Sequence, residues 1–165
     1  MPQSFAEALH AAGPAADRAA RMSLYAWLIG SWTFDAVVLL DNGIRHEGSG
    51  EIYARWVLEG RAIQDVWILP GMFHGTTLRA YDPNLDAWHI IWSDPLRQVY
   101  RRQIGRAHGS EIMQEGRDEA GVLTRWRFVD IDPAKNSFRW LGERAPDGEN
   151  WQRQAELAVR RVVSV

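Results

Sequence analysis

The candidates for chemistry in this sequence are a few polar and aromatic residues expected on one face of neighbouring strands: Arg102, Glu115, Thr124, Tyr100 and Trp88. A buried arginine needs a partner, and Glu115 opposite Arg102 would form an ion pair in a low-dielectric interior. Trp88 opposite Arg102 would add a cation–π contact. In an enzyme, Arg102 would anchor a carboxylate or a phenol, and Glu115 or Tyr100 would transfer a proton. The alternatives are a purely structural cross-strand ion pair and an outward position for both charges.

Two further ionisable residues, His46 and Asp65, are expected on the same inward face. The predicted partner of Asp65 is Ala54, which separates Asp65 from His46 by roughly 26 Å at about 3.3 Å per residue. The two side chains are therefore not expected to form a catalytic dyad. We interpret His46 as a histidine of the rim or core and expect Asp65 to bind an arginine or a water molecule.

Metal and cofactor chemistry has no motif in the sequence. The chain contains no cysteine, and its five histidines show no ligand spacing such as H-E-x-x-H. It has no G-x-S-x-G nucleophile elbow, and Gly71 and Gly75 form no phosphate-binding loop. We therefore expect neither a bound metal nor a cofactor.

Tryptophan is unusually frequent, with nine residues in the chain. Six of them are expected to line the inner face of a sheet: Trp56, Trp67, Trp88, Trp92, Trp126 and Trp140. Together with His46 and Asp65, they are the predicted ligand-binding residues. Tryptophans on one face ordinarily fill a core, but this many favour a rigid, amphipathic wall for a planar or hydrophobic ligand.

The elements that must position these residues are strands. From Ser31 onward, apolar residues recur with a period of two, and turn segments such as Asp41-Asn42-Gly43 interrupt them. About nine or ten alternating segments with short loops predict an antiparallel meander. A meander of this length removes its edges by closing into an up-and-down β-barrel, so the predicted fold class is all-β.

Residues 1–30 have a different pattern. Ser4-Phe5-Ala6-Glu7 is a capping box at a helix start, Gly13 ends that helix, and residues 14–30 show helical spacing of apolar side chains. We expect a helical N-terminal segment that packs on or caps the barrel. Residues 1–165 are expected to form one domain.

Hairpin geometry predicts which residues share the inner face. The first two turns place Val38 opposite His46 and Ala54 opposite Asp65. The apolar face of the next hairpin is expected to comprise Leu78, Ala80, Trp88, Ile90 and Trp92. The later predicted pairs are Ile90 with Tyr100, Trp88 with Arg102, Ile104 with Met113, Arg102 with Glu115, Glu115 with Thr124, and Trp126 with Trp140.

Charge and hydropathy exclude several classes of protein. Nineteen basic residues against 21 acidic ones give a net charge of −2, which argues against a nucleic-acid partner. No apolar run approaches the roughly 18 residues of a membrane-spanning helix, so no membrane partner is expected. The sequence has no signal-peptide pattern, and together with the absence of cysteine this predicts a cytoplasmic protein.

The segment Gly30-Ser31-Trp32, after a helical turn, resembles the G-x-W signature of the lipocalin-like (calycin) superfamily. In that group an arginine near the end of the last strand packs over the tryptophan, and Arg161 matches that position. Bacterial lipocalin-like domains of unknown function are similar in three further stretches: Trp56 to Arg61, Ala80 to Trp92, and Trp126 to Arg161. The resemblance covers about residues 24–162 and implies a barrel with a ligand-binding lumen.

Two functions follow as hypotheses. The first is intracellular binding of a small hydrophobic or aromatic molecule in a tryptophan-lined barrel lumen. The alternative is a cofactor-free lyase or isomerase that uses Arg102, Glu115 and Tyr100 in the lumen, by analogy with phenolic-acid decarboxylases. A homodimer is a further option, through an outward patch of Val37, Leu39 and Val57.

Overall fold

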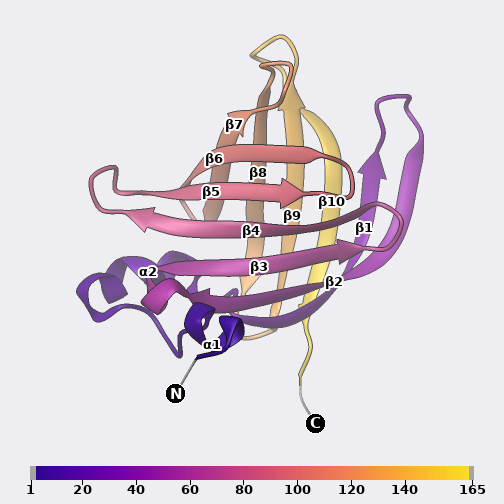
Figure 1. Cartoon of the computed structure of the whole chain (residues 1–165). Coiled ribbons are helices and arrows are strands. Elements are labelled where there is room, and N and C mark those ends of the chain that lie inside the picture. Colours follow the sequence, from indigo (N-terminus) through magenta and orange to yellow (C-terminus); the bar gives the residue numbers. More distant parts are fainter. Residues whose placement is uncertain (1–2, 164–165) are drawn as a thin grey trace.

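The computed structural model describes residues 3–163, which form a closed antiparallel barrel with short helices at one end (Figure 1). Each strand pairs with its neighbours in sequence, and the last strand returns to pair with the first. The predicted all-β, up-and-down barrel is confirmed. Its strands are β1 (Gly30–Leu39), β2 (Arg45–Val57), β3 (Ala62–Leu69), β4 (Phe73–Asp82), β5 (Ala87–Asp94), β6 (Val99–His108), β7 (Glu111–Arg117), β8 (Leu123–Asp132), β9 (Ser137–Ala145) and β10 (Gln152–Arg161).

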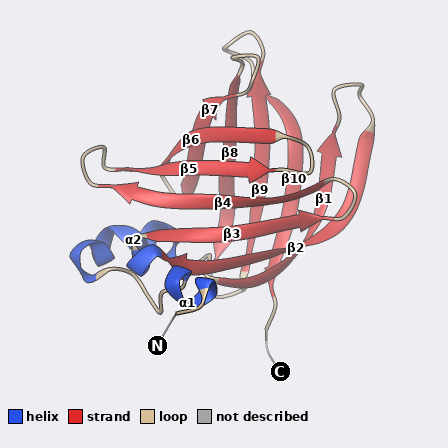
Figure 2. Ribbon diagram, viewed as in Figure 1, coloured by secondary structure: helices blue, strands red, loops and turns tan. Residues whose placement is uncertain are grey.

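The N-terminal segment is helical, as expected, although residues 1 and 2 lie outside the described part. It comprises α1 (Phe5–Leu9), a short 3-10 helix η1 (Ala16–Arg18) and α2 (Ala19–Ala26), which lie together at one end of the barrel (Figure 2). The predicted capping box is present: Ser4 Oγ accepts from the Glu7 amide, and the Glu7 carboxylate accepts from the Ser4 amide. A second 3-10 turn, η2 (Leu58–Gly60), connects β2 to β3 and carries Gly60, against which residues 13–15 pack.

The up-and-down topology gives the barrel two different ends. We call the end beside α2 the closed end, because Met22, Tyr25 and Leu28 are fully buried there. The Tyr25 ring meets Trp88 and Phe128 edge-on, with ring centroids 4.9 and 5.9 Å apart. The opposite end, which we call the mouth, carries the loops that follow β1, β3, β5, β7 and β9.

Closure of the barrel brings Trp32 of β1 opposite Arg161 of β10. The Arg161 guanidinium lies 4.0 Å above the indole ring, and it donates hydrogen bonds to the carbonyl oxygens of Trp27 and Ile29. These bonds satisfy backbone carbonyl groups that follow α2. Arg161 thereby connects β10 with the segment after α2 and with β1. The arrangement implied by the lipocalin-like resemblance is therefore present for Trp32 and Arg161.

The registers predicted for the first two hairpins are confirmed. Val38 lies opposite His46, and Ala54 lies opposite Asp65. Both hairpins have strong local turn signals, which fix the register and hence the face of the residues within these two hairpins. On the outer side, the expected apolar patch is incomplete, because Val57 is buried and bridges to His10.

The prediction for the hairpin of β4 and β5 is wrong by one residue. Trp88, Ile90 and Trp92 do face inward, but their partners are Tyr81, Arg79 and Thr77, and Leu78 and Ala80 lie on the outer face. The cause is a four-residue loop in which Asp86 adopts a left-handed φ of +47°. An even-membered loop inverts the face of one strand relative to the prediction.

A similar error affects β6 and β7. The loop from Pro95 to Gln98 has four residues, with Gln98 at φ +58°, so that Tyr100 pairs with Ser93 and Arg102 with Ile91 on the outer face. The predicted inner pairs Ile90 with Tyr100 and Trp88 with Arg102 are therefore wrong. The observed inner partners of Ile90 and Trp88 are Gln103 and Gly105.

The wrong face continues through the hairpin of β6 and β7, and a one-residue shift in the hairpin of β7 and β8 then restores the predicted face. Ile104 pairs with Glu115 instead of Met113, and Glu115 pairs with Arg125 instead of Thr124. Trp126 then pairs with Gly142, and Phe128 with Trp140. The predicted partners differ, but the predicted inward faces of Trp126, Trp140 and Thr124 are right, because two odd shifts restore the original face.

Candidate functional site

A cavity of about 520 Å³ opens at the mouth and reaches to the middle of the barrel. Pockets for small molecules commonly have volumes of roughly 300–1,000 Å³. The closed end is filled by side chains of α2 and of the strands, so the cavity occupies only the mouth half of the lumen. The barrel is therefore neither a solid core nor a through channel.

Aromatic side chains form the wall of the cavity: Trp67, Phe73, Trp92, Trp126 and Trp140. Trp126 stacks on Trp140 with ring centroids 3.9 Å apart and planes 18° apart, and Trp67 meets the same ring at 4.1 Å. We call Trp67, Trp140 and Trp126 the indole stack. A side chain at Gly142 would collide with the Trp126 ring, so this glycine leaves the space that the ring occupies.

The floor of the cavity is polar and is built around Arg79. Its guanidinium forms an ion pair with Asp65, and both side chains are completely buried. Arg79 Nε also donates to Gln114 Oε1 over 3.2 Å, and the Tyr25 hydroxyl donates to the same oxygen over 2.9 Å. Asp65 Oδ1 accepts from the Thr77 amide at 3.1 Å. Burial lowers the pKa of Arg79 to about 10, which leaves the guanidinium charged at neutral pH.

Unpaired donors are concentrated at this cavity. Within residues 3–163, six buried side-chain nitrogen or oxygen atoms have no hydrogen-bond partner, and five of them belong to cavity-lining residues. These five are Trp67 Nε1, Arg79 Nη2, Gln103 Nε2, Thr124 Oγ1 and Trp140 Nε1. Buried polar groups are normally satisfied in folded proteins, so this concentration marks the cavity as an incomplete hydrogen-bonding environment.

The rim of the mouth carries charged residues that are paired with one another. Arg97 contacts Asp94, Arg101 contacts Glu119, and Arg144 contacts Asp118 at 2.9 Å. Burial would raise the pKa of Asp118, but hydrogen bonds from the amides of Val122 and Ala120 and the charge of Arg144 outweigh it and lower the pKa. These pairs order the loops around the opening.

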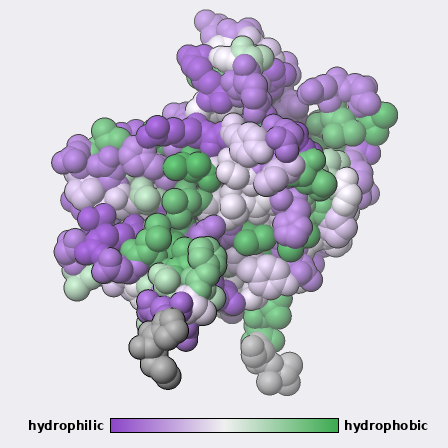
Figure 3. All heavy atoms as spheres, viewed as in Figure 1, coloured by the Kyte–Doolittle hydropathy of each residue, from purple (hydrophilic) through white to green (hydrophobic). Residues whose placement is uncertain are grey.

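One side of the mouth is apolar. Leu39, Leu40 and Ile44 are exposed at the tip of the β1–β2 hairpin, and hydrophobic atoms gather over this projecting hairpin in Figure 3. Val38, Leu39 and Leu40 also line the cavity. An apolar molecule would therefore meet apolar surface before it enters the lumen.

The structure divides the predicted ligand-binding residues into three groups. Trp67, Trp92, Trp126 and Trp140 line the cavity, and Asp65 lies beneath its floor with an arginine partner, as expected. Trp56 and Trp88 instead belong to the packed core of the barrel. His46 is half-buried on the inner face of β2 near the mouth and is not among the cavity-lining residues.

The predicted catalytic cluster is not formed in the lumen. Arg102 is exposed and contacts His89 Nδ1 at 3.2 Å on the outer surface, and Tyr100 is 53% exposed. Glu115 is also exposed, opposite Arg125. Of the five residues proposed for chemistry, only Thr124 lines the cavity. The four-residue loop after β5 turns Tyr100, Arg102 and, through the pairing of β6 with β7, Glu115 outward. Trp88 faces inward as predicted but belongs to the packed core.

Sequence reasoning missed Arg79, Gln103 and Gln114, the main polar residues of the cavity. A signal for Arg79 was present: the loop between β3 and β4 pairs Asp65 with Thr77 and Ile63 with Arg79. Carrying the inward face from Asp65 across Pro70 and Gly71 would have placed Arg79 inside. The predicted set used the apolar residues Leu78 and Ala80 to choose the face, which favoured the wrong one.

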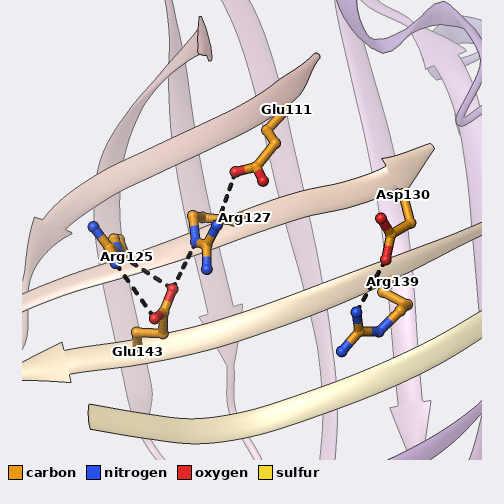
Figure 4. A network of polar contacts seen from close by, with 6 residues as sticks. All are labelled: Glu111, Arg125, Arg127, Asp130, Arg139 and Glu143. Carbon is orange, nitrogen blue, oxygen red and sulfur yellow. Dashed lines mark hydrogen bonds and ion pairs between the residues drawn. The ribbon is translucent and has the colours of Figure 1, made fainter. Parts of the chain in front are cut away.

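A cluster of arginine and glutamate side chains, of the kind found in binding sites, also occurs on the outer face of β7, β8 and β9. Figure 4 shows Arg127 between Glu111 and Glu143, with Arg125 on the other side of Glu143. Burial would raise the pKa of Glu143, but hydrogen bonds from Arg127 and Arg125 outweigh it and lower the pKa. Every carboxylate here already has an arginine partner, so the network is structural.

Residues 3–163 contain no cluster of three or more histidine, aspartate or glutamate side chains that could hold a metal ion. Among the helices of the described chain, none has the length and apolar character needed to cross a bilayer.

Comparisons with known proteins support the fold alone. No protein-family model matches the sequence, and no curated protein matches it. Among solved structures, the chain is similar to the crystal structure of Rv2717c from M. tuberculosis, with a TM-score of 0.61 and 13% sequence identity. The match covers 87% of this chain and 98% of Rv2717c. The chain thus shares the closed barrel architecture of Rv2717c, and its cavity must be interpreted from its own residues.

Proposed function

We propose that this barrel binds a small, planar, mainly aromatic molecule in the cavity at its mouth. The observation that carries the proposal is the cavity of about 520 Å³ whose wall contains the indole stack. Trp126 is the ring of the indole stack that remains partly exposed, and Trp67 and Trp140 hold it in place from behind. A ring fixed in this way offers a flat surface with little conformational freedom to lose, so a planar ligand would bind without a large entropic cost.

The packed closed end supports the same proposal. Because Tyr25, Trp88 and Phe128 fill the lower lumen, the cavity floor is supported by a rigid core. Ligand sites are commonly preformed, mostly apolar clefts with a few placed polar groups, and this cavity has that composition. We further propose that the chain is a member of the lipocalin-like superfamily and that it is located in the cytoplasm. The contact of Arg161 with Trp32 supports the former.

The alternative function, a lyase or isomerase based on Arg102, Glu115 and Tyr100, loses its geometric premise. These side chains lie on the outer surface, outside the cavity at the mouth, where water competes for every proton transfer. Binding therefore remains the better supported of the two functions.

The test is mass spectrometry of small molecules extracted from protein purified from its own host, with a matched pair of variants. Ala155 lines the cavity and Ala158 lies exposed on the same strand, β10. We expect a stoichiometric aromatic compound in the wild type and in Ala158→Phe. Ala155→Phe should lack it, because the added ring occupies the cavity. Circular dichroism would confirm that both variants fold.

An unchanged amount of compound in Ala155→Phe would contradict the proposed location. An empty extract, combined with no calorimetric binding of aromatic probes to the wild type, would contradict the proposed function itself.

A further inference from the structure

We infer that the ligand of this cavity is a planar aromatic acid whose carboxylate enters first and binds at the polar floor. This inference rests on the proposed binding function and specifies the chemical class of the ligand. It starts from the five unpaired polar atoms of the cavity.

The five atoms are almost entirely hydrogen-bond donors. An indole nitrogen, an arginine nitrogen and an amide nitrogen can only donate, and a threonine hydroxyl can donate or accept. Trp67, Arg79, Gln103 and Trp140 therefore present unmet N–H groups. A ligand group that binds these N–H groups must accept hydrogen bonds, which excludes an ammonium group or another cation.

The other polar atoms of the floor already form hydrogen bonds with one another. The remaining donors can therefore be identified atom by atom. Arg79 uses Nη1 for Asp65 and Nε for Gln114, so Nη2 is the nitrogen left over. Gln114 Oε1 accepts from both Arg79 and Tyr25, and this fixes the orientation of its amide. The network holds the guanidinium in place and leaves it one unpaired nitrogen.

Strand register places three of the five, Arg79, Gln103 and Thr124, in one row around the inner wall. Arg79 pairs with Ile90, Ile90 with Gln103, Gln103 with Gly116, and Gly116 with Thr124. Gly116 has no side chain between its neighbours, and a β-carbon there would press against Gln103 Cγ at 2.9 Å. The glycine therefore lets Gln103 and Thr124 approach the same region of the lumen.

The same row continues toward the mouth. Thr124 pairs with Arg144, which lines the cavity and is half-buried beside Asp118. The row thus begins at a fully buried arginine and ends at a second arginine near the opening. An acidic group entering through the mouth would pass the paired Arg144 and the rim carboxylates Asp118 and Glu119 before it reaches Thr124, Gln103 and Arg79.

A carboxylate fits these donors better than a neutral carbonyl group does. It offers about four lone-pair positions, and hydrogen bonds to a charged acceptor are roughly twice as strong as neutral ones. Asp65 balances the charge of Arg79, so attraction comes from short hydrogen bonds and not from a net positive field. We therefore expect affinity for the acid to depend little on salt concentration, since buried interactions are screened weakly.

The first experiment compares four probes of the same ring by isothermal titration calorimetry: 2-naphthoate, 2-naphthamide, 2-naphthylmethylamine and 2-methylnaphthalene. We expect 2-naphthoate to bind the wild-type protein at least about tenfold more tightly than the other three, which corresponds to about 1.4 kcal/mol. Equal or tighter binding of the amine would overturn the carboxylate assignment and leave the binding function intact. Failure of all four probes would overturn the binding function as well.

The second experiment removes two of the five donors and leaves the Arg79–Asp65 pair unchanged. Gln103→Leu and Thr124→Val replace unpaired buried polar groups with apolar groups of similar shape, so both variants should unfold at a higher temperature than the wild type. Each should weaken 2-naphthoate binding by about tenfold, with little change for 2-methylnaphthalene. The control is Thr33→Val on the exposed face of β1. Unchanged naphthoate affinity in both donor variants would overturn the inference.

Discussion

The central residue of the molecule is Arg79, whose guanidinium lies in a fully buried position among both charged and aromatic neighbours. It pairs with Asp65 and lies 5.4 Å from the centre of the Tyr25 ring and 5.6 Å from that of Phe128. A charge in this position is tolerated only because its partner and its hydrogen bonds replace the lost hydration. The pair therefore contributes more to fixing one arrangement of the lumen than to net stability.

This view predicts different outcomes for single and double substitutions. Asp65→Leu leaves the Arg79 charge buried without its partner and should destabilise the protein by about 3–5 kcal/mol. Arg79→Met combined with Asp65→Leu removes both charges and should recover most of that loss. Urea unfolding monitored by tryptophan fluorescence gives both values. A double variant as unstable as the single one would contradict the argument.

The elements of this fold depend on glycines that lie beneath aromatic rings. Gly142 of β9 lies under Trp126, Gly75 of β4 under Trp92, and a β-carbon at either position would collide with the indole. The indole of one strand thus packs on the backbone of the glycine in the neighbouring strand, and it fills the space that the glycine leaves empty. The wall of the cavity is built from these cross-strand combinations.

Gly142→Ala tests this arrangement. The added methyl group must push Trp126 into the cavity, so the variant should lose about 1–3 kcal/mol of stability and show an altered near-ultraviolet circular dichroism spectrum. Gly13→Ala is the control, because nothing lies within 4 Å of the added atom and φ is not left-handed there. The control should stay within about 0.5 kcal/mol of the wild type. Equal effects of both substitutions would contradict the proposed packing.

At the level of elements, the strands could be predicted from the sequence and the loops between them only in part. Alternation of residue types identified the barrel, and Asp41-Asn42-Gly43 fixed the first register. The loops around β5 depend on non-glycine residues, Asp86 and Gln98, that adopt left-handed φ angles. Such residues carry a weak sequence signal, and a one-residue change in a loop turns the next strand over.

The candidate site was predictable to the same extent. Trp67, Trp126 and Trp140 could be placed because bulky apolar residues mark the inner face directly. Arg79 and Gln103 could not be recognised by type, since arginine and glutamine usually mark the outer face. Their burial follows from register alone, and register was the weakest part of the prediction.

The molecule as a whole carries charge pairs on its outer wall and around its mouth, and these determine its response to acid. In the folded protein the pKa values of Asp118 and Glu143 lie below the ordinary values of 3.8 and 4.5. Their contribution to stability is complete above the ordinary values and is lost as the pH falls through the lowered ones.

We therefore expect the free energy of unfolding to be level above about pH 5 and to fall as the pH decreases below about 4, because the unfolded chain then binds more protons than the folded one. Chemical unfolding measured across this range gives the slope. Asp118→Asn should make the slope shallower, whereas a slope unchanged by this substitution would assign the acid sensitivity to other carboxylates.

The closeness of the three rings in the indole stack has an optical consequence. Chromophores at centroid distances of 3.9 and 4.1 Å do not absorb independently, and their electronic transitions couple. Such coupling produces paired bands of opposite sign in circular dichroism, whose intensity depends on the angles between the rings. A molecule that slides against Trp126 would change those angles. Binding of the proposed ligand against Trp126 would therefore be detectable by circular dichroism without an attached label.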